Sequence, residues 1–315
     1  MLGVSTTCGS GWLCPNIDCN FGKINRPLLQ AVLTILRILV TGGSGYLGTH
    51  VRRFFNAEDL SRRSHLDILS PLDVARVGAY DVVIHLAAHL SKDPGETEAI
   101  FRTNVEGTVN LLREMSPHSI FIFASTKDVY GAHADNFNEV PETCTTDYAN
   151  HGALEWSKLI AEKYVQFYAT ERNFRSCIFR LSTVYGRPSE GNQNGFVSHY
   201  VESVKRRWPI HLPLEGKPVR DILHVDDFSR ACQAFIDSSI PHGLYNLGGG
   251  PANAVSLREI IDRVATQIEI SPIIDDSAEL PMPVPLNYIS DLTRVNSDLG
   301  WQPTVGVDEG LKSLV

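Results

Sequence analysis

One short segment constrains the fold of this chain more than any other feature. Residues 40–48 read Val-Thr-Gly-Gly-Ser-Gly-Tyr-Leu-Gly, with a glycine at every third position from 42 to 48. An apolar run precedes the segment and a helical pattern opens at Tyr46, which predicts a turn between a strand and a helix. Glycines at this spacing let the backbone turn sharply and approach a pyrophosphate, which the free N–H groups of the helix then bind. The segment therefore predicts a dinucleotide-binding site.

Apolar runs alternate with helical patterns along the rest of the chain. Strands are predicted at 37–40, 82–86, 120–124 and 177–181, and helices from residue 46 and over 104–115, 159–168 and 291–299. The predicted strands are apolar throughout, which is typical of a parallel sheet covered by helices on both faces. The predicted fold class is therefore α/β, with a Rossmann-type doubly wound parallel sheet.

Composition places the chain among ordinary globular proteins. Of its 315 residues, 43% are hydrophobic and 20% are charged, which excludes a disordered chain, a fibre and a disulfide-dense mini-protein. The net charge of −8 and the lack of a basic stripe argue against a nucleic-acid partner. The spacing of Cys8, Cys14 and Cys19 does not match a paired zinc site, so no metal site is predicted.

The first 36 residues fit nothing downstream. They are predicted to be an N-terminal extension that is either disordered or not native. The apolar run at 28–36 superficially resembles a signal peptide, but it is too short to span a bilayer and lacks a small-residue cleavage site. It also runs directly into the first predicted strand. We therefore expect a cytoplasmic protein that does not contact a membrane.

Beyond the glycine turn, five ordered segments resemble the extended short-chain dehydrogenase/reductase family, in particular its NAD(P)-dependent nucleotide-sugar epimerases, dehydratases and reductases. These segments lie at 81–88, 104–108, 125–131, 219–227 and 299–303, so the resemblance covers roughly residues 37–315. It implies a smaller C-terminal substrate domain beside the Rossmann domain. The expected bounds are 37–185 plus 219–248 for the dinucleotide-binding domain, and 186–218 plus 249–315 for the substrate-binding domain. A homodimer is expected by the same analogy.

The resemblance also implies which residues hold the cofactor. They follow the glycine turn and the ends of the next strands: Gly42, Gly45, Tyr46, Leu47, Gly48, Asp67, Ile68, Leu86, Ala87, Ala88, Asn104 and Lys158. Arg62 and Arg63 lie about 20 residues past the first glycine, where an acid would hold a ribose 2′-hydroxyl and arginines suit a 2′-phosphate. They favour NADP(H), while Glu58 and Asp59 nearby keep NAD(H) as the alternative.

The catalytic motif departs from the family pattern at one position. The family uses Tyr-x-x-x-Lys, in which the tyrosine exchanges a proton and the lysine holds the nicotinamide ribose. In this chain Lys158 occupies the lysine position, but the tyrosine position holds Leu154, which has no ionisable group. The nearby groups that could replace the phenol are Tyr148, His151 and Glu155, of which His151 carries an imidazole, the side chain that most often transfers protons near neutral pH.

Leu154 is also compatible with a chemistry that does not need the phenol, or with no chemistry at all. Thr126-Lys127-Asp128 resembles the threonine-acid segment of the family's dehydratases and decarboxylases, so Asp128 is a second candidate for moving the proton. Lys127 stands where those enzymes have their first acid. Alternatively, the protein binds its cofactor without turnover.

The substrate is predicted less directly than the cofactor. The resemblance implies substrate contacts from His89, Thr183, Asn194 and Arg220, with Asn194 and Arg220 holding a nucleotide diphosphate. The chain is thus expected to be an NAD(P)-dependent enzyme that acts by hydride transfer, with an atypical proton donor, on a nucleotide-activated sugar or a related polar ketone or alcohol. Thr126, Asp128, Lys158 and His151 are the expected catalytic residues. The alternative is an atypical or inactive NAD(P)-binding sensor or scaffold.

Overall fold

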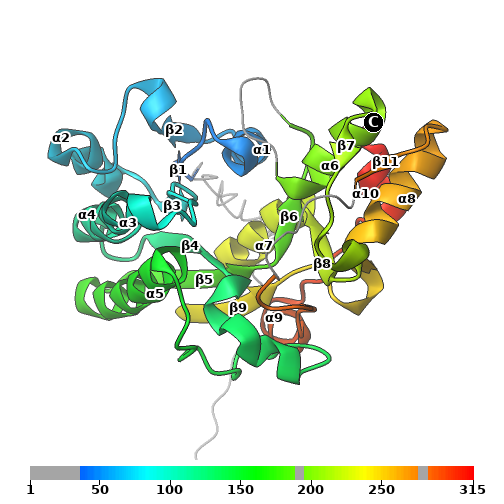
Figure 1. Ribbon diagram of the computed structural model, residues 1–315. Coiled ribbons are helices and arrows are strands. Elements are labelled where there is room, and N and C mark those ends of the chain that lie inside the picture. The colour runs from blue at the N-terminus through cyan, green and yellow to red at the C-terminus, as the bar shows by residue number, and fades with distance from the viewer. Residues whose placement is uncertain (1–35, 189–194, 276–282) are drawn as a thin grey trace, which may run out of the picture. The chain divides into compact units, whose positions relative to one another are not determined.

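The computed structural model describes residues 36–188, 195–275 and 283–315 (Figure 1). Its larger sheet has six strands in the order β2-β1-β3-β4-β5-β9, and all neighbouring pairs run parallel. These strands are β1 (Ile38–Thr41), β2 (Glu58–Leu60), β3 (Val82–His85), β4 (Ile120–Thr126), β5 (Arg175–Leu181) and β9 (His242–Leu247). The predicted α/β class and doubly wound parallel sheet are confirmed.

Helices cover both faces of this sheet, because successive strand residues are apolar on both sides. On one face, Val40 of β1 packs in one core cluster with residues of α1 (Tyr46–Phe55) and α7 (Val225–Asp237). On the other face, Leu39 packs in a second cluster with residues of α4 (Gly107–Glu114) and α5 (Ala153–Arg172). The parallel register brings the carboxyl ends of β1, β3 and β4 to one edge, where ligands bind in open α/β sheets.

A second group of elements packs around its own core (Figure 1). It contains a three-stranded sheet of β10 (Ala254–Ser256), β8 (Val219–His224) and β6 (Thr183–Tyr185), and a parallel pair of β11 (Ile273–Ile274) and β7 (Pro209–Ile210). Its helices are α6 (Phe196–Arg206), α8 (Leu257–Ile268) and α10 (Val307–Lys312). Within the segment 219–248, β8 therefore joins the small sheet and β9 the large one. The expected domain bounds remain a prediction.

Two predicted helices have different bounds in the structure. The helix expected at 104–115 is preceded by α3 (Thr97–Phe101) and by a π-helical turn at Arg102–Glu106, after which α4 begins. The helix expected at 159–168 is longer and begins at Ala153, because the Glu155 carboxylate accepts a hydrogen bond from the Gly152 N–H group. The predicted helix at 291–299 is confirmed as α9 (Thr293–Leu299), which starts two residues later than expected.

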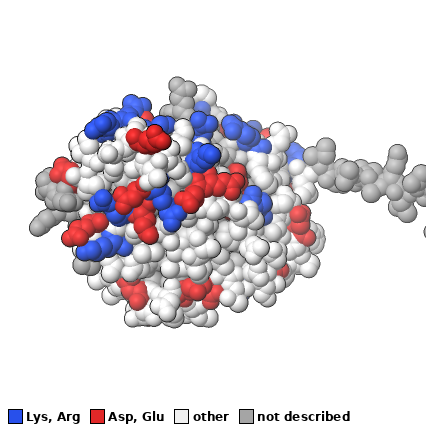
Figure 2. Space-filling model, turned by 90° about the vertical axis from the view of Figure 1, so that its right-hand side faces the viewer, with Lys and Arg blue, Asp and Glu red and all other residues white. Residues whose placement is uncertain are grey.

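The face formed by α6, α8 and α10 carries charges of both signs. Lys and Arg side chains lie among Asp and Glu side chains on it (Figure 2). Ion pairs join Arg258 to Asp262 and Arg263 to Asp308. No helix within the described part of the chain has the length and apolar character needed to cross a membrane.

Candidate active site

The glycine turn has the tight geometry that a dinucleotide cradle requires. Gly42 has a φ of +68°, and a Cβ at this position would lie 2.8 Å from the Ala87 nitrogen. A Cβ on Gly48 would lie 2.0 Å from the Gly42 carbonyl oxygen. Only glycine fits at both positions, so the first turn of α1 packs directly against the loop. The chain thus presents bare backbone where a pyrophosphate would approach the helix N-terminus.

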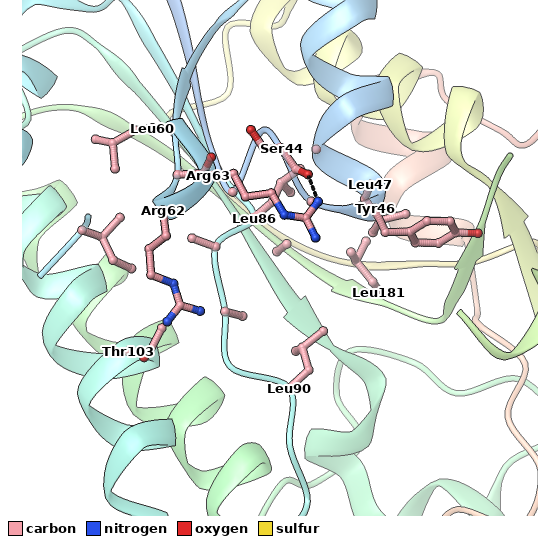
Figure 3. A pocket seen from close by; sticks show the side chains of 18 of the residues that line it. Ser44, Tyr46, Leu47, Leu60, Arg62, Arg63, Leu86, Leu90, Thr103 and Leu181 are labelled. Atoms are coloured by element: carbon pink, nitrogen blue, oxygen red, sulfur yellow. Dashed lines mark hydrogen bonds between the residues drawn. The ribbon is translucent and has the colours of Figure 1, made fainter. Parts of the chain in front are cut away.

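A cleft of about 560 Å³ opens above this turn (Figure 3). The predicted cofactor residues that line it are Gly42, Gly45, Tyr46, Leu47, Gly48, Arg62, Arg63, Asp67, Ile68, Leu86, Ala87, Ala88 and Lys158. They come from the ends of β1, β2 and β3 and from α5, which meet at one edge of the sheet. The residues present therefore fit a bound dinucleotide along this edge.

The charges at the end of β2 bear on the cofactor's ribose. Figure 3 shows Arg62 extending along the cleft toward Thr103, while Arg63 donates a hydrogen bond to the Ser44 carbonyl oxygen at 3.0 Å. Asp59 is engaged elsewhere and does not line the cleft. Its Oδ2 atom accepts hydrogen bonds from Ser44 and, at 2.9 Å, from Ser61. The cleft thus presents guanidinium groups, and no carboxylate from β2.

Asn104 lies behind the cleft. It is buried in the π-helical turn, where its Oδ1 atom accepts from the His89 N–H group at 2.7 Å. Its Nδ2 atom donates to the His89 carbonyl oxygen at 3.0 Å and to Ser157 Oγ at 2.9 Å. These bonds join the loop after β3 to α5. In this structure Asn104 positions that loop and does not line the cleft itself.

Two of the expected catalytic residues lie at the inner end of the cleft. Thr126 ends β4, and Lys158 projects from α5 toward the same strand. The Lys158 Nζ atom donates to the Ala124 carbonyl oxygen at 2.8 Å and lies 4.8 Å from the centre of the Phe123 ring. Burial lowers the pKa of Lys158 to about 8, since removal from water disfavours the charged form.

A second cavity of about 660 Å³ adjoins this end. Three segments pass from one cavity to the other: the strand end from Thr126 to Asp128, α5 from Lys158 to Leu154, and the loop from Leu90 to Lys92. Leu154 forms a buried apolar wall of the second cavity. The groups predicted as substitutes for the phenol also line it: Tyr148, His151 and Glu155. The fold therefore brings all the candidate proton carriers to one cavity beside Thr126.

Asp128 is held between two ammonium groups. Its Oδ1 atom lies 2.5 Å from Lys127 Nζ, and its Oδ2 atom lies 3.1 Å from Lys92 Nζ. Burial alone would raise the pKa of Asp128, but the two lysines lower it well below its usual range. Asp128 is therefore ionised at neutral pH and cannot supply a proton there, and the two lysines that lower its pKa also make it a weak proton acceptor.

His151 and Tyr148 line this cavity and form an aromatic row with Trp156. The His151 ring packs edge-on against Tyr148 at 5.5 Å and against Trp156 at 5.8 Å. Its Nε2 atom lies 3.2 Å from the Thr146 carbonyl oxygen. Tyr148 in turn lies on Gly131, where any Cβ would come within 2.3 Å of the ring.

Three of the expected substrate residues, His89, Thr183 and Arg220, line neither cavity. His89 Nε2 lies 2.6 Å from a Glu96 carboxylate oxygen, and Thr183 begins β6. Arg220 is buried, with its guanidinium donating to the carbonyl oxygens of Pro285 and Leu286 at 2.9 Å and 2.8 Å. Asn194 lies outside the described residues. Their roles in binding a substrate remain predictions.

Lys92 is the residue of the site that sequence reasoning missed. It lies in an irregular loop after β3, with no helical or strand period and no motif around it. The only signal was its position seven residues past the apolar strand end at 82–85, which by itself does not distinguish it from a solvated lysine.

Comparisons with known proteins agree with this geometry. Residues 38–248 match the model of the NAD dependent epimerase/dehydratase family. CDP-paratose 2-epimerase of Salmonella typhi is 26% identical over 89% of this chain and 98% of its own. dTDP-4-dehydro-6-deoxyglucose reductase of Escherichia coli is 26% identical over 74% of this chain and 73% of its own. The structure of UDP-glucose 4-epimerase from Thermotoga maritima, solved with UDP-glucose, matches with a TM-score of 0.74 and 25% identity over 88% of this chain and 97% of its own.

Proposed function

Since the chain belongs to the NAD-dependent epimerase/dehydratase family, we propose that it is an NAD(P)-dependent enzyme acting on a nucleotide-activated sugar. The observation that carries the proposal is that the two cavities share the end of β4. Thr126 lines the dinucleotide cleft, and Asp128, two residues later, lines the second cavity. The names of the epimerase and reductase relatives support a sugar substrate. When bound, the nicotinamide would supply hydride chemistry at the carbon that carries the reacting oxygen.

Each expected catalytic residue has a proposed role that follows from its contacts. Thr126 would hold the reacting oxygen, since it ends β4 where the cavities meet. Lys158 would hold the nicotinamide ribose through its ammonium group. Asp128, or one of His151, Tyr148 and Glu155, which line the same cavity, would move the proton. Arg220, His89 and Thr183, with Asn194, would contact the nucleotide sugar.

Fluorescence titration followed by a turnover assay tests the proposed function. Purified protein is titrated with NADPH and NADH, and then incubated with UDP-, dTDP- and CDP-hexoses while products are separated by chromatography. Binding of a nicotinamide cofactor together with conversion of one sugar is the expected result. Cofactor binding without any conversion would favour the alternative, a sensor or scaffold, for which Leu154 is the specific observation.

We expect Arg62→Ala to weaken NADPH binding and to leave NADH binding nearly unchanged. A hydrogen bond to a charged group contributes about 1.5–3 kcal/mol, so the NADPH dissociation constant should rise by roughly 10- to 100-fold. Fluorescence titration of both cofactors measures the effect. Arg53→Ala, an exposed arginine of α1 outside the cleft, is the control. An equal loss of affinity for NADPH and NADH would contradict the proposed contact with a 2′-phosphate.

We expect NADPH affinity to fall as the pH rises through about 8. The pKa of Lys158 is lowered to about 8, so its ammonium group loses a proton over this range, and with it the positive charge next to the ribose. Titrations from about pH 7 to about pH 9 span this step. Lys158→Met should bind more weakly than the wild type below about pH 8 and lack the step. A step of the same size in Lys158→Met would assign the pH dependence to another group.

A homodimer is also proposed, on the basis of α5. Three of its aromatic side chains are exposed, namely Trp156 at 43%, Tyr164 at 40% and Phe167 at 56%. Such residues at helical spacing on a surface are typical of an interface. Sedimentation equilibrium should give a dimer, and Phe167→Glu should shift it toward monomer. A wild-type monomer at micromolar concentration would end this part of the proposal.

A further inference from the structure

Lys92 spans the second cavity between the two elements that flank the reacting position. Its Nζ atom lies 3.1 Å from Asp128 Oδ2 and 3.4 Å from Glu155 Oε1. Asp128 follows Thr126 at the end of β4, and Glu155 follows Leu154 in the first turn of α5. The two carboxylates therefore hold the ammonium group between the segment that follows β4 and the first turn of α5.

The wall of the second cavity is apolar at Leu154, the position at which the family has its tyrosine. Leu154 is 6% exposed and aliphatic. Among the described residues that line the second cavity, Lys92 is the only lysine or arginine. His151 and Tyr148 also line it, but both rings are packed within the aromatic row, and His151 Nε2 faces the Thr146 carbonyl. Lys92 is thus the cation best placed to reach a substrate oxygen in this cavity.

We propose that Lys92 occupies the functional place of the missing phenol, with its ammonium group donating a hydrogen bond to the sugar oxygen that Thr126 also holds. This inference rests on the proposed function. A sugar oxygen that changes between alcohol and ketone acquires partial negative charge in the transition state, and a fixed ammonium group stabilises that charge. The side chain of Lys92 is 61% exposed, so it can exchange its solvent contacts for a ligand without breaking both ion pairs.

The Lys92 side chain is expected to stay protonated and so to carry a permanent positive charge. Burial alone would lower the pKa of its ammonium group, but Asp128 and Glu155 raise it. The group therefore keeps its proton at neutral pH and acts as a hydrogen-bond donor, while proton transfer remains with the carriers proposed above.

Chemical labelling tests the contact without relying on turnover. Lysine amines are acetylated with N-hydroxysuccinimidyl acetate, and the rate at Lys92 is read by peptide mass spectrometry. Bound UDP-glucose, or the UDP-, dTDP- or CDP-hexose that binds most tightly, should slow acetylation of Lys92, whereas the matching nucleoside diphosphate should not. Lys217, which is ion-paired to Glu215 at 3.0 Å and lines neither cavity, is the control lysine. A role limited to holding Asp128 and Glu155 would give no sugar-dependent protection.

Kinetics of two variants and a control complete the test. Lys92→Met should lower kcat by about 100-fold, as expected for loss of one charge-stabilising donor, and leave KM nearly unchanged. Lys92→Arg should retain more activity than Lys92→Met, and Lys217→Met should match the wild type. In the Lys92→Met background, Leu154→Tyr should restore part of the lost kcat, because the phenol would enter the same space.

Two outcomes would overturn the inference. Sugar binding without protection of Lys92 would exclude the contact while leaving the proposed function intact. A protein that binds no nucleotide sugar at all would remove the proposed function, and the role of Lys92 with it.

Discussion

Replacing Gly48 by alanine should weaken cofactor binding severely. The added Cβ would lie 2.0 Å from the Gly42 carbonyl oxygen and 2.7 Å from the Gly43 Cα atom, and both are backbone atoms that cannot rotate away. Either α1 or the loop must move, and the N–H groups at the start of α1 then lose their place beside the pyrophosphate. We expect the NADPH dissociation constant to rise by about 100-fold or more, equivalent to about 2.7 kcal/mol. Fluorescence titration measures it.

Two other glycines provide a graded series for this variant. A Cβ on Gly45 would approach the Gly42 carbonyl oxygen only to 3.0 Å, so Gly45→Ala should weaken binding less than Gly48→Ala. Gly306, which precedes α10, has nothing within 4 Å of its Cβ position, so Gly306→Ala should bind like the wild type. Circular dichroism would establish that all three variants fold. If folded Gly48→Ala bound NADPH with wild-type affinity, the proposed role of the glycine turn in binding the pyrophosphate would be wrong.

Glu162→Gln should destabilise the protein by about 3–5 kcal/mol, because it leaves the buried guanidinium of Arg180 without its counter-charge. The Glu162 side chain is 1% exposed, and that of Arg180 is 7% exposed. Their two hydrogen bonds measure 3.0 Å and 2.7 Å. Ser125, which lines the dinucleotide cleft, also donates to Glu162 at 2.5 Å. Urea unfolding followed by circular dichroism measures the loss in free energy of unfolding.

A surface ion pair supplies the matched comparison. Glu202 pairs with Arg206 one turn along α6, and the Arg206 side chain is 59% exposed. Water screens this pair, so Glu202→Gln should change the free energy of unfolding by less than about 1 kcal/mol. Equal effects of the two substitutions would show that Arg180 keeps its charge solvated after Glu162 is neutralised, and would contradict the importance of the buried pair.

Prediction from the sequence succeeded best where a local pattern of residue types requires a particular backbone conformation. The glycine turn was predicted because a positive φ at Gly42 and the close approach at Gly48 exclude side chains. The inner strands were predicted because both faces of a covered parallel strand are apolar. β3 and β5 lie within two residues of their expected starts. The start of α5 was missed, since the capping contact of Glu155 with Gly152 is a single bond that periodicity does not reveal.

The sequence predicted only part of the candidate active site in this way. Thr126, Asp128 and Lys158 were identified by motif, and they do lie near one another, because β4 and α5 are adjacent in the fold. Lys92 belongs to no motif. Its place in the site is shown only by its contacts with Asp128, 36 residues away, and with Glu155 farther along the chain. Lys127 and Lys92 together lower the pKa of Asp128 against the effect of burial, and the contact with Lys92 has no signature in the sequence.

Sequence alone determined the fold class, the position of the cofactor turn and the absence of a phenol at position 154, because each of these depends on residue types at short, regular spacing. Tertiary structure decided three things. It directed the Asp59 carboxylate toward Ser44, so that Arg62 and not Asp59 lines the cleft. It placed Asn104 behind the loop that it supports. It also brought Lys92 between Asp128 and Glu155. Contacts between distant segments carry no signature in local periodicity, and the direction of a side chain depends on the neighbours that fold against it.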